Sequence, residues 1–177
     1  NVVKANLEID NIGKRIKELK LSQYEAMVYI HKYITKNYEY GFHSTTITRE
    51  DMRERINERD RSMISAIQDK MTVCVGFAAL TKAIIDRLNM PGLICAYEYA
   101  DVYERDKNTE EITRFQGGHC LNKIDITDKK YEIDGTYLSD ATIDSRSVNH
   151  PNGCGYGYFM YHISDTKDFK NPLGKRP

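Results

Sequence analysis

Apolar residues recur at helical spacing in the first half of the chain and alternate with polar residues in much of the second half. Downstream of residue 25, apolar side chains return every three or four positions, as expected for one face of a helix, at Ala26, Met27, Ile30, Tyr33 and Ile34. Ser22 and Glu25 form a capping-box pattern that marks a helix start. The pattern predicts a helix over residues 23–37 and a further helical stretch before it, at about 11–20.

The segment 48–68 is densely charged, and its apolar positions are sparse. This pattern is typical of one broken helix or two short helices at the surface. Charges of both signs alternate over 53–61. We therefore interpret that run as a solvated helix face and not as a ligand site.

A third helix is expected from Cys74 to about Asn89. Its apolar positions form a wide face, made of Phe77, Ala78, Leu80, Thr81, Ile84, Ile85 and Leu88. The sequence Met90-Pro91-Gly92 should end it, because proline cannot continue a helix and glycine permits a chain reversal. A helix with so wide an apolar face belongs in the centre of the fold.

The rest of the chain favours strands separated by polar turns. The expected strands cover residues 93–99, 112–115, 119–124, 130–133 and 158–163. The pattern predicts an α+β fold, with a helical N-terminal half packed on an antiparallel sheet. We expect one domain over 1–177, in which 1–20 form an N-terminal extension and 138–177 a C-terminal region of loop and strand.

Composition narrows the range of partners. Lys plus Arg and Asp plus Glu each number 26 in 177 residues, so no basic field exists to attract nucleic acid. No apolar run approaches the roughly 18 residues of a membrane span. We expect neither nucleic acid as a partner nor a membrane span. The chain begins without Met or a signal-peptide pattern, and its cysteines fit a cytosolic protein as well as a secreted or cell-surface fragment.

The four cysteines follow no zinc-ligand spacing, and a domain of this size needs no disulfide framework. Cys95 lies in an apolar run and is expected to be a small buried side chain, whereas Cys120 and Cys154 are left unassigned. Four histidines are expected to have structural roles: His31, His43, His150 and His162. The sequence predicts no metal site and no cofactor.

Cys74 is the candidate nucleophile. In the first turn of a buried helix, free backbone N–H groups and the positive end of the helix dipole would stabilise a thiolate and could also receive an oxyanion. A single cysteine at a helix start is more often only a packed apolar residue. Its interpretation as a nucleophile therefore depends on its partners.

His119 and Asp134 are the candidate partners. A hairpin centred on residues 125–128 would place the two directly opposite each other, where a carboxylate can accept from an imidazole N–H. A tighter turn at Asp128-Lys129 would instead leave them on one face but four residues out of step. Gly117-Gly118, just before the histidine, fits a close approach of backbone or substrate, a bulge or a loop end.

These residues, with their neighbours, resemble the transglutaminase-like superfamily. The resemblance spans about 21–137 and rests on Tyr38-Glu39-Tyr40, Thr72-Val73-Cys74-Val75-Gly76-Phe77-Ala78, Leu88-Asn89-Met90-Pro91, Gly118-His119 and Ile133-Asp134-Gly135-Thr136-Tyr137. It implies a papain-like fold with Cys74, His119 and Asp134 as catalytic residues. An oxyanion donor is expected in the backbone N–H of Cys74, and a second one in Gln68 or Tyr38.

The chain departs from the family pattern at two places. Leu121 stands where family members usually carry an aromatic residue, and Gly135 stands where they carry a proline. These departures affect the pockets for the acyl group and the amine more than the three candidate catalytic residues. The Gly/Tyr-rich segment 152–158 matches nothing in the family and is either a loop beside the active site or a plain surface loop.

The resemblance implies acyl transfer through a thioester on protein or peptide carboxamides. The acyl group would pass to water, as in a peptidase or amidase, or to a Lys or other amine, as in a crosslinking enzyme. A non-catalytic binding or scaffold module that keeps the fold is the alternative. Acyl-CoA-dependent arylamine transfer would use the same residues, but the sequence shows no basic pocket of cofactor size.

Overall fold

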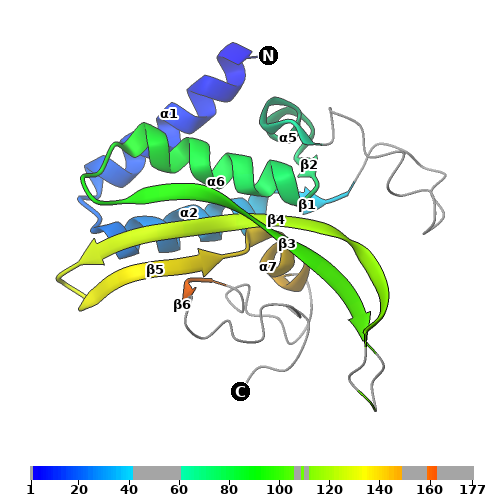
Figure 1. Ribbon diagram of the computed structural model, residues 1–177. Coiled ribbons are helices and arrows are strands. Elements are labelled where there is room, and N and C mark those ends of the chain that lie inside the picture. Colours follow the sequence, from blue (N-terminus) through cyan, green and yellow to red (C-terminus); the bar gives the residue numbers. More distant parts are fainter. Residues whose placement is uncertain (1, 42–60, 106–108, 110–111, 149–158, 163–177) are drawn as a thin grey trace.

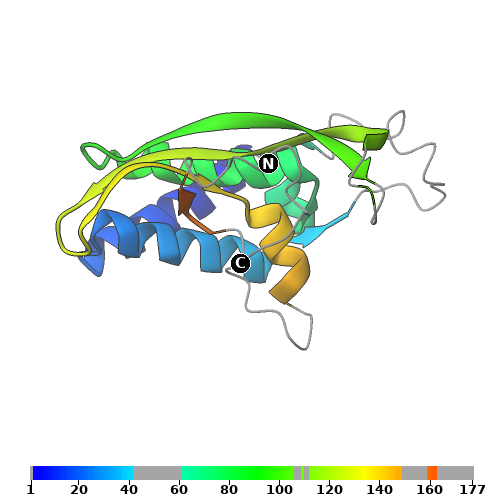
Figure 2. The same ribbon diagram turned by 60° about the horizontal axis from the view of Figure 1, so that its bottom comes forward.

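The computed structural model describes residues 2–41, 61–105, 109, 112–148 and 159–162. A four-stranded antiparallel sheet with the order β3-β4-β5-β6 forms one layer. Helices lie on one side of this sheet (Figures 1 and 2). The strands are β3 (Ile94–Arg105), β4 (Ile112–Asp128), β5 (Ile133–Ser139) and β6 (Tyr161–His162). The expected α+β class, with an antiparallel sheet, is confirmed.

The central helix is α6 (Cys74–Leu88), which packs against β3 and β4. Its buried face includes Phe77, Leu80 and Ile84, each about 1% exposed. The predicted helix start at Cys74 is confirmed. The helix ends at Leu88 because Asn89 takes the left-handed conformation (φ 50°) just before the expected proline stop.

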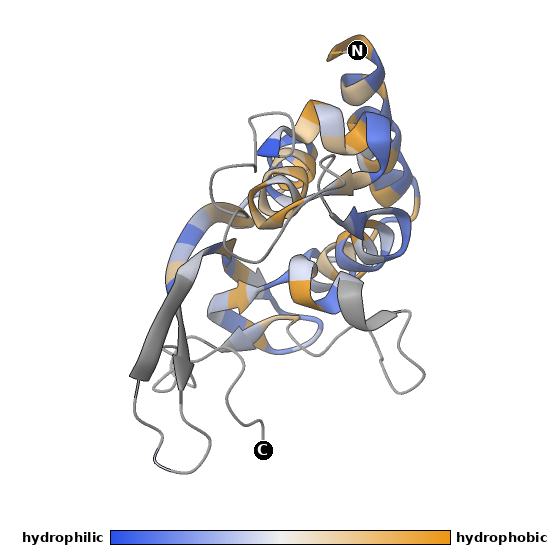
Figure 3. Cartoon of the chain, turned by 90° about the vertical axis from the view of Figure 1, so that its right-hand side faces the viewer, coloured by the Kyte–Doolittle hydropathy of each residue, from blue (hydrophilic) through white to orange (hydrophobic). Residues whose placement is uncertain are grey.

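Two further helices pack beside α6. Helix α2 (Gln23–Asn37) begins with the predicted capping box: the Ser22 N–H donates to Glu25 Oε2 over 2.9 Å, and the Ser22 hydroxyl accepts from the Glu25 N–H. Helix α1 (Val2–Glu18) is longer than the sequence indicated and packs against α6. The hydrophobic residues at its free end, beside the N label in Figure 3, include Val3, which is 79% exposed.

A short parallel pair joins the end of α2 to the start of α6. Strand β1 (Glu39–Tyr40) pairs with β2 (Met71–Thr72), in the register Glu39 with Met71 and Tyr40 with Thr72. Helix α5 (Met63–Asp69) leads into β2 through Lys70, which is left-handed (φ 55°). This pair fixes the chain just ahead of Cys74. Neither strand was predicted, because two residues are too short to show a period.

The turn between β4 and β5 lies later in the chain than predicted. Residues 129–132 form the turn, so the strand expected at 130–133 is wrong, and β5 begins only at Ile133. Asp128 holds this turn, because its carboxylate accepts from the Lys130 N–H at 3.0 Å and from the Tyr24 N–H at 2.8 Å. The turn is thereby fixed to the start of α2, which a local reading of turn residues could not reveal.

After β5 the chain forms a helix, α7 (Ala141–Val148), where only loop and strand were expected. Its residues Thr142, Ile143 and Val148 are β-branched, and such residues are poor helix formers in isolation. The helix packs against α2 and α6, so tertiary contacts stabilise it.

Several predictions concern residues outside the described ranges. They include the surface helices over most of 48–68, the charged run at 53–61, His43, His150, Cys154 and the loop 152–158. Within the described ranges, no helix is both long and apolar enough to cross a membrane.

Candidate active site

Cys74 is the first residue of α6, and the residue before it offers no cap. Val73 makes no side-chain hydrogen bond to the helix start. The N–H groups of Gly76 and Phe77 donate to the Val73 carbonyl at 2.9 and 3.2 Å, and the Val75 N–H donates to the Cys74 sulfur. Of the two N–H groups that a capping side chain usually takes, those of Val75 and Gly76, the one of Val75 is therefore directed at the thiol.

The start of α6 is closely packed on β2. A Cβ on Gly76 would overlap the hydroxyl of Thr72 and lie 2.8 Å from its Cβ. Thr72 is itself buried, at 1% exposure. The first turn of the helix can approach β2 this closely only because residue 76 has no side chain. This contact determines how close the start of α6, and with it Cys74, lies to the parallel pair β1-β2.

His119 lies on β4, beyond the part that pairs with β5. Pairing between the two strands ends at Asn122 and Ser139. The edge of β4 next to His119 is therefore not covered by β5. Asp140 follows Ser139 directly, so it lies across from Leu121 and diagonal to His119. Such diagonal neighbours on one face are about 7–8 Å apart, within reach of an imidazole and a carboxylate.

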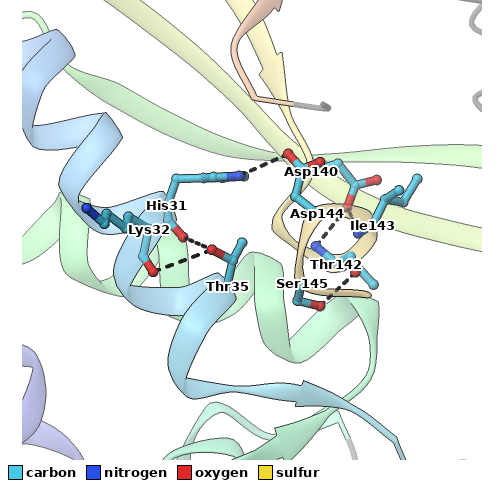
Figure 4. A network of polar contacts seen from close by, with 8 residues as sticks. All are labelled: His31, Lys32, Thr35, Asp140, Thr142, Ile143, Asp144 and Ser145. Atoms are coloured by element: carbon cyan, nitrogen blue, oxygen red, sulfur yellow. Dashed lines mark hydrogen bonds and ion pairs between the residues drawn. The ribbon is translucent and has the colours of Figure 1, made fainter. Parts of the chain in front are cut away.

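The side chains of His119 and Asp140 meet in this way. His119 Nε2 is 2.5 Å from Asp140 Oδ2, and the Asp140 side chain is 2% exposed. The other oxygen, Oδ1, accepts from the N–H groups of Thr142 and Ile143 at 3.0 and 3.2 Å (Figure 4). Asp140 is thus the cap of α7, and its carboxylate is held from one side by the helix and from the other by the imidazole.

Asp134, the predicted partner of His119, is elsewhere, and this prediction is wrong in its geometry. It pairs with Thr127 and accepts a hydrogen bond from that hydroxyl at 2.7 Å. Thr127 is eight residues along β4 from His119, or roughly 26 Å at 3.3 Å per residue. The cause is the hairpin register: the turn at 129–132 shifts the pairing even further than the tighter alternative at Asp128-Lys129.

Asp140 is the functional candidate that the sequence reading missed. Two local patterns point to it. An Asp at residue 128 with a turn directly after it sets the register. An Asp followed by helix N–H groups at residues 142 and 143 is an N-cap pattern. The two patterns identify Asp140 only when it is known that Asp128 binds the start of α2 and so places the turn at 129–132.

The Cys74 thiol and the His119 ring share a hydrogen bond. Since Asp140 takes Nε2, the ring nitrogen left for the sulfur is Nδ1. Burial by itself would raise the pKa of Cys74. The hydrogen bond and positive charge of His119, with the N–H groups of Cys120 and Val75, outweigh burial and place the thiol pKa below its ordinary value.

His119 is shifted in the complementary direction. Burial by itself would lower the pKa of the imidazole. Hydrogen bonds to Asp140 and Cys74, together with the negative charge of each, outweigh burial and raise the pKa of His119 to about 10. The two shifts favour the same state of the site, a thiolate beside an imidazolium.

The other cysteines in the described part of the chain have the opposite character. Burial, with the charge of Cys74 as a further cause, raises the pKa of Cys120 to about 11. Burial also raises the pKa of Cys95 to about 12, and its 3% exposure confirms the prediction of a buried side chain. Of these three thiols only Cys74 is shifted towards the thiolate.

The two side chains predicted as oxyanion donors have different surroundings. The Tyr38 hydroxyl donates a hydrogen bond to Glu8 at 2.5 Å and contacts Lys70. The prediction of Tyr38 as an oxyanion donor is therefore wrong. Burial and the Glu8 carboxylate raise the pKa of Tyr38 far above its ordinary value. Gln68 is exposed on α5, and no hydrogen bond joins its amide to another described residue. Its role as a donor stays a prediction.

Two other predictions near the site have clear outcomes. Gly117, with φ 150°, lies at a β-bulge where the pairing of β3 and β4 shifts, so the bulge among the three expectations is observed. A Cβ on Gly118 would meet nothing within 4 Å, which argues against a close backbone approach there, whereas the approach of a substrate stays a prediction. His31 is buried and paired with Asp144, as expected for a structural histidine.

The arrangement has a defined chemical capacity. A thiol with a lowered pKa can attack a carbonyl carbon, and the imidazolium beside it can protonate a leaving amine. The buried carboxylate holds the ring in one orientation and stabilises its positive charge. Among the described residues, no group of three or more His, Cys, Asp and Glu side chains is placed to hold a metal ion.

No protein-family model matches the chain, and no curated protein matches its sequence. Solved structures of other proteins are similar to it, including the following two. One, described as a TGase, is 13% identical at a TM-score of 0.48, over 80% of this chain and 32% of that one. The other, a candidate cysteine protease from Cytophaga hutchinsonii, is 21% identical at a TM-score of 0.41, over 76% and 37%.

This chain thus spans about a third of the length of either protein. At TM-scores below 0.5, neither likeness decides an activity for it. The geometry of Cys74, His119 and Asp140 is what bears on function.

Proposed function

We propose that the protein is a cysteine acyltransferase or hydrolase that acts on protein or peptide carboxamides through a thioester. The observation that carries this proposal is one chain of contacts: the Cys74 thiol at an uncapped helix start, the His119 ring beside it, and the buried Asp140 carboxylate on the far ring nitrogen. A papain-like core, which the sequence resemblance implies, belongs to the same proposal.

The first half of the proposed reaction forms the thioester. The Cys74 thiolate attacks the carboxamide carbon, and the carbonyl oxygen becomes an oxyanion, for which the Cys74 N–H is the first candidate donor. The C–N bond then breaks, and His119 gives its proton to the departing ammonia or amine. Asp140 stabilises the imidazolium before this transfer and keeps Nδ1 directed at the sulfur.

The second half releases the acyl group. Neutral His119 removes a proton from an incoming amine or water, which attacks the thioester carbon. The C–S bond breaks, and the Cys74 thiolate and the His119 imidazolium are regenerated. An amine acceptor gives a new amide, as in a crosslinking enzyme, and water gives a free acid, as in a peptidase or amidase.

A Gln-containing peptide incubated with the protein and a dansyl-labelled primary amine tests the proposal. Incorporation of the dansyl group indicates transfer, and conversion of the Gln to Glu or cleavage of the peptide indicates hydrolysis. Trapping at low pH should show the acyl adduct on the Cys74 peptide by mass spectrometry.

Cys74→Ala should abolish every product, whereas Cys120→Ala, which removes the neighbouring buried thiol, should leave product formation in place. Absence of any product, together with alkylation of Cys74 no faster than that of Cys95 and Cys120, would overturn the proposal. It would favour instead a binding or scaffold module that keeps the fold.

A further inference from the structure

Helix α7 carries two carboxylates one turn apart, and each faces a histidine. Asp140 contacts His119 of β4. Asp144 contacts His31 of α2 at 3.0 Å (Figure 4). Residues four apart lie on the same side of a helix. The backbone N–H of Asp144 also donates to the Asp140 carbonyl at 3.4 Å, in the first turn of α7. The two pairs are therefore mechanically linked through a single helical turn.

The second pair is almost inaccessible to solvent. The His31 and Asp144 side chains are 2% and 1% exposed, and the Phe159 ring lies over the imidazole with its centroid at 4.8 Å. A carboxylate buried this deeply needs polar partners, since its desolvation is expensive. The contact with His31 therefore fixes how α7 is rotated on α2.

The direction of the Asp140 carboxylate depends on that rotation. Its Oδ1 is bound to the N–H groups of Thr142 and Ile143, so it moves with the first turn of α7. A helix of eight residues is unstable alone and takes its position from tertiary contacts. Any shift of α7 on α2 would carry Oδ2 away from the His119 ring.

We propose that His31 and Asp144 are positioning residues, which hold α7 on α2 and thereby keep the Asp140 carboxylate on His119. Neither contacts Cys74; both act through Asp140. The inference rests on the proposed function only in taking Cys74 and His119 as the reacting pair. It adds a second, structural His–Asp pair to the three residues of the site.

The test is the pH dependence of Cys74 alkylation by iodoacetamide, followed on the Cys74 peptide by mass spectrometry. Loss of the positioning pair in His31→Leu should move the profile to higher pH and slow alkylation near pH 6 about tenfold or more. His31→Gln keeps an N–H donor near the place of Nε2 and should retain a profile close to that of the parent protein. A role in stability alone would lower the melting temperature without moving the profile of the folded protein.

Thr35→Val is the matched control. Thr35 is buried one turn further along α2, and its hydroxyl donates only within that helix, to the His31 and Lys32 carbonyls. Its profile should be unchanged. An unshifted profile in folded His31→Leu, or an equal shift in Thr35→Val, overturns the inference. If His31→Leu fails to fold, Asp144→Ala, which removes the group that contacts His31, decides in the same way: a raised midpoint supports the inference, and an unchanged one overturns it.

The experiment also separates this inference from the proposed function. If the parent protein shows no enhanced alkylation of Cys74 at low pH, the thiolate–imidazolium pair itself fails. If the parent shows it and His31→Leu leaves it in place, only the positioning role fails.

Discussion

Replacing Asp140 by Asn removes one negative charge behind His119. Asn is as good a helix cap as Asp, so the hydrogen bonds from Thr142 and Ile143 to the side-chain oxygen are expected to persist. The side chain keeps its size, and the position is buried, so water does not replace the lost charge. With the side-chain oxygen kept by the helix, the amide NH2 replaces Oδ2. Asp140→Asn therefore removes the negative charge together with the hydrogen bond that Oδ2 accepts from the ring.

The size of the effect follows from the pKa of His119, which is about 10 against 6.5 for an ordinary histidine. At about 1.4 kcal/mol per pKa unit, the site favours the imidazolium by roughly 5 kcal/mol. The hydrogen bond that the ring donates to Asp140 is the largest of the stabilising causes, ahead of the one to Cys74. If the two partners share the effect evenly, the loss costs on the order of 2 kcal/mol, or about 30-fold in the equilibrium constant between the ion pair and the neutral pair.

Two assays measure this loss. The rate of Cys74 alkylation near neutral pH should fall in Asp140→Asn, by at most about 30-fold, and its midpoint should move to higher pH. The rate of product formation from a Gln peptide should fall further, by about 100-fold or more, because the proton transfer also loses its support. Circular dichroism and thermal unfolding should confirm that α7 is retained.

Asp134→Asn is the matched control, since Asp134 is exposed and bonded to Thr127. Its alkylation profile and product rate should equal those of the parent protein. If Asp134→Asn lost activity while Asp140→Asn kept it, the hairpin register would be wrong at the active site, and so would the reasoning built on it.

Two further outcomes are expected. The pH profile of kcat/KM should be bell-shaped. The rate should fall at low pH, where the Cys74 thiolate, whose pKa is lowered, takes up a proton, and again near pH 10, where His119 loses its proton. A single rise near an ordinary thiol pKa would contradict this prediction. Gly76→Ala should destabilise the protein by about 1–3 kcal/mol in chemical denaturation, because the new methyl group meets Thr72. Gly118→Ala, with open space around it, should change stability by less than about 0.5 kcal/mol, and equal effects of the two variants would contradict the packing argument.

Helices α2 and α6 could be predicted from the sequence because the signals that define them are local. The capping box at Ser22 and Glu25 and the apolar face after Cys74 each specify a helix start within a few residues. The placement of Cys74 as the first residue of α6 needed no tertiary information. The same holds for Cys95, whose apolar surroundings along the chain matched its burial.

The acid of the site was not accessible in this way. Both Asp134 and Asp140 have the right parity to share a face with His119, so alternation could not choose between them. The choice depends on where the hairpin turns, and that is fixed by Asp128 bonding to the Tyr24 N–H, about a hundred residues earlier in the chain. The prediction for Tyr38 was also wrong because of a contact distant in sequence: its hydroxyl donates a hydrogen bond to Glu8 of α1.

The bare start of α6 implies a compromise between robustness and reactivity. Val73 has no side-chain acceptor, so the Val75 N–H is left to the Cys74 sulfur, where in most helices a Ser, Thr or Asp side chain would accept from it. Val73→Thr, nearly identical in shape, offers a hydroxyl to that N–H group. The substitution should both raise the melting temperature and slow the reaction of the Cys74 thiol. A screen for higher thermal stability would then recover substitutions at position 73 that lower the activity, and a screen for activity would remove the same substitutions.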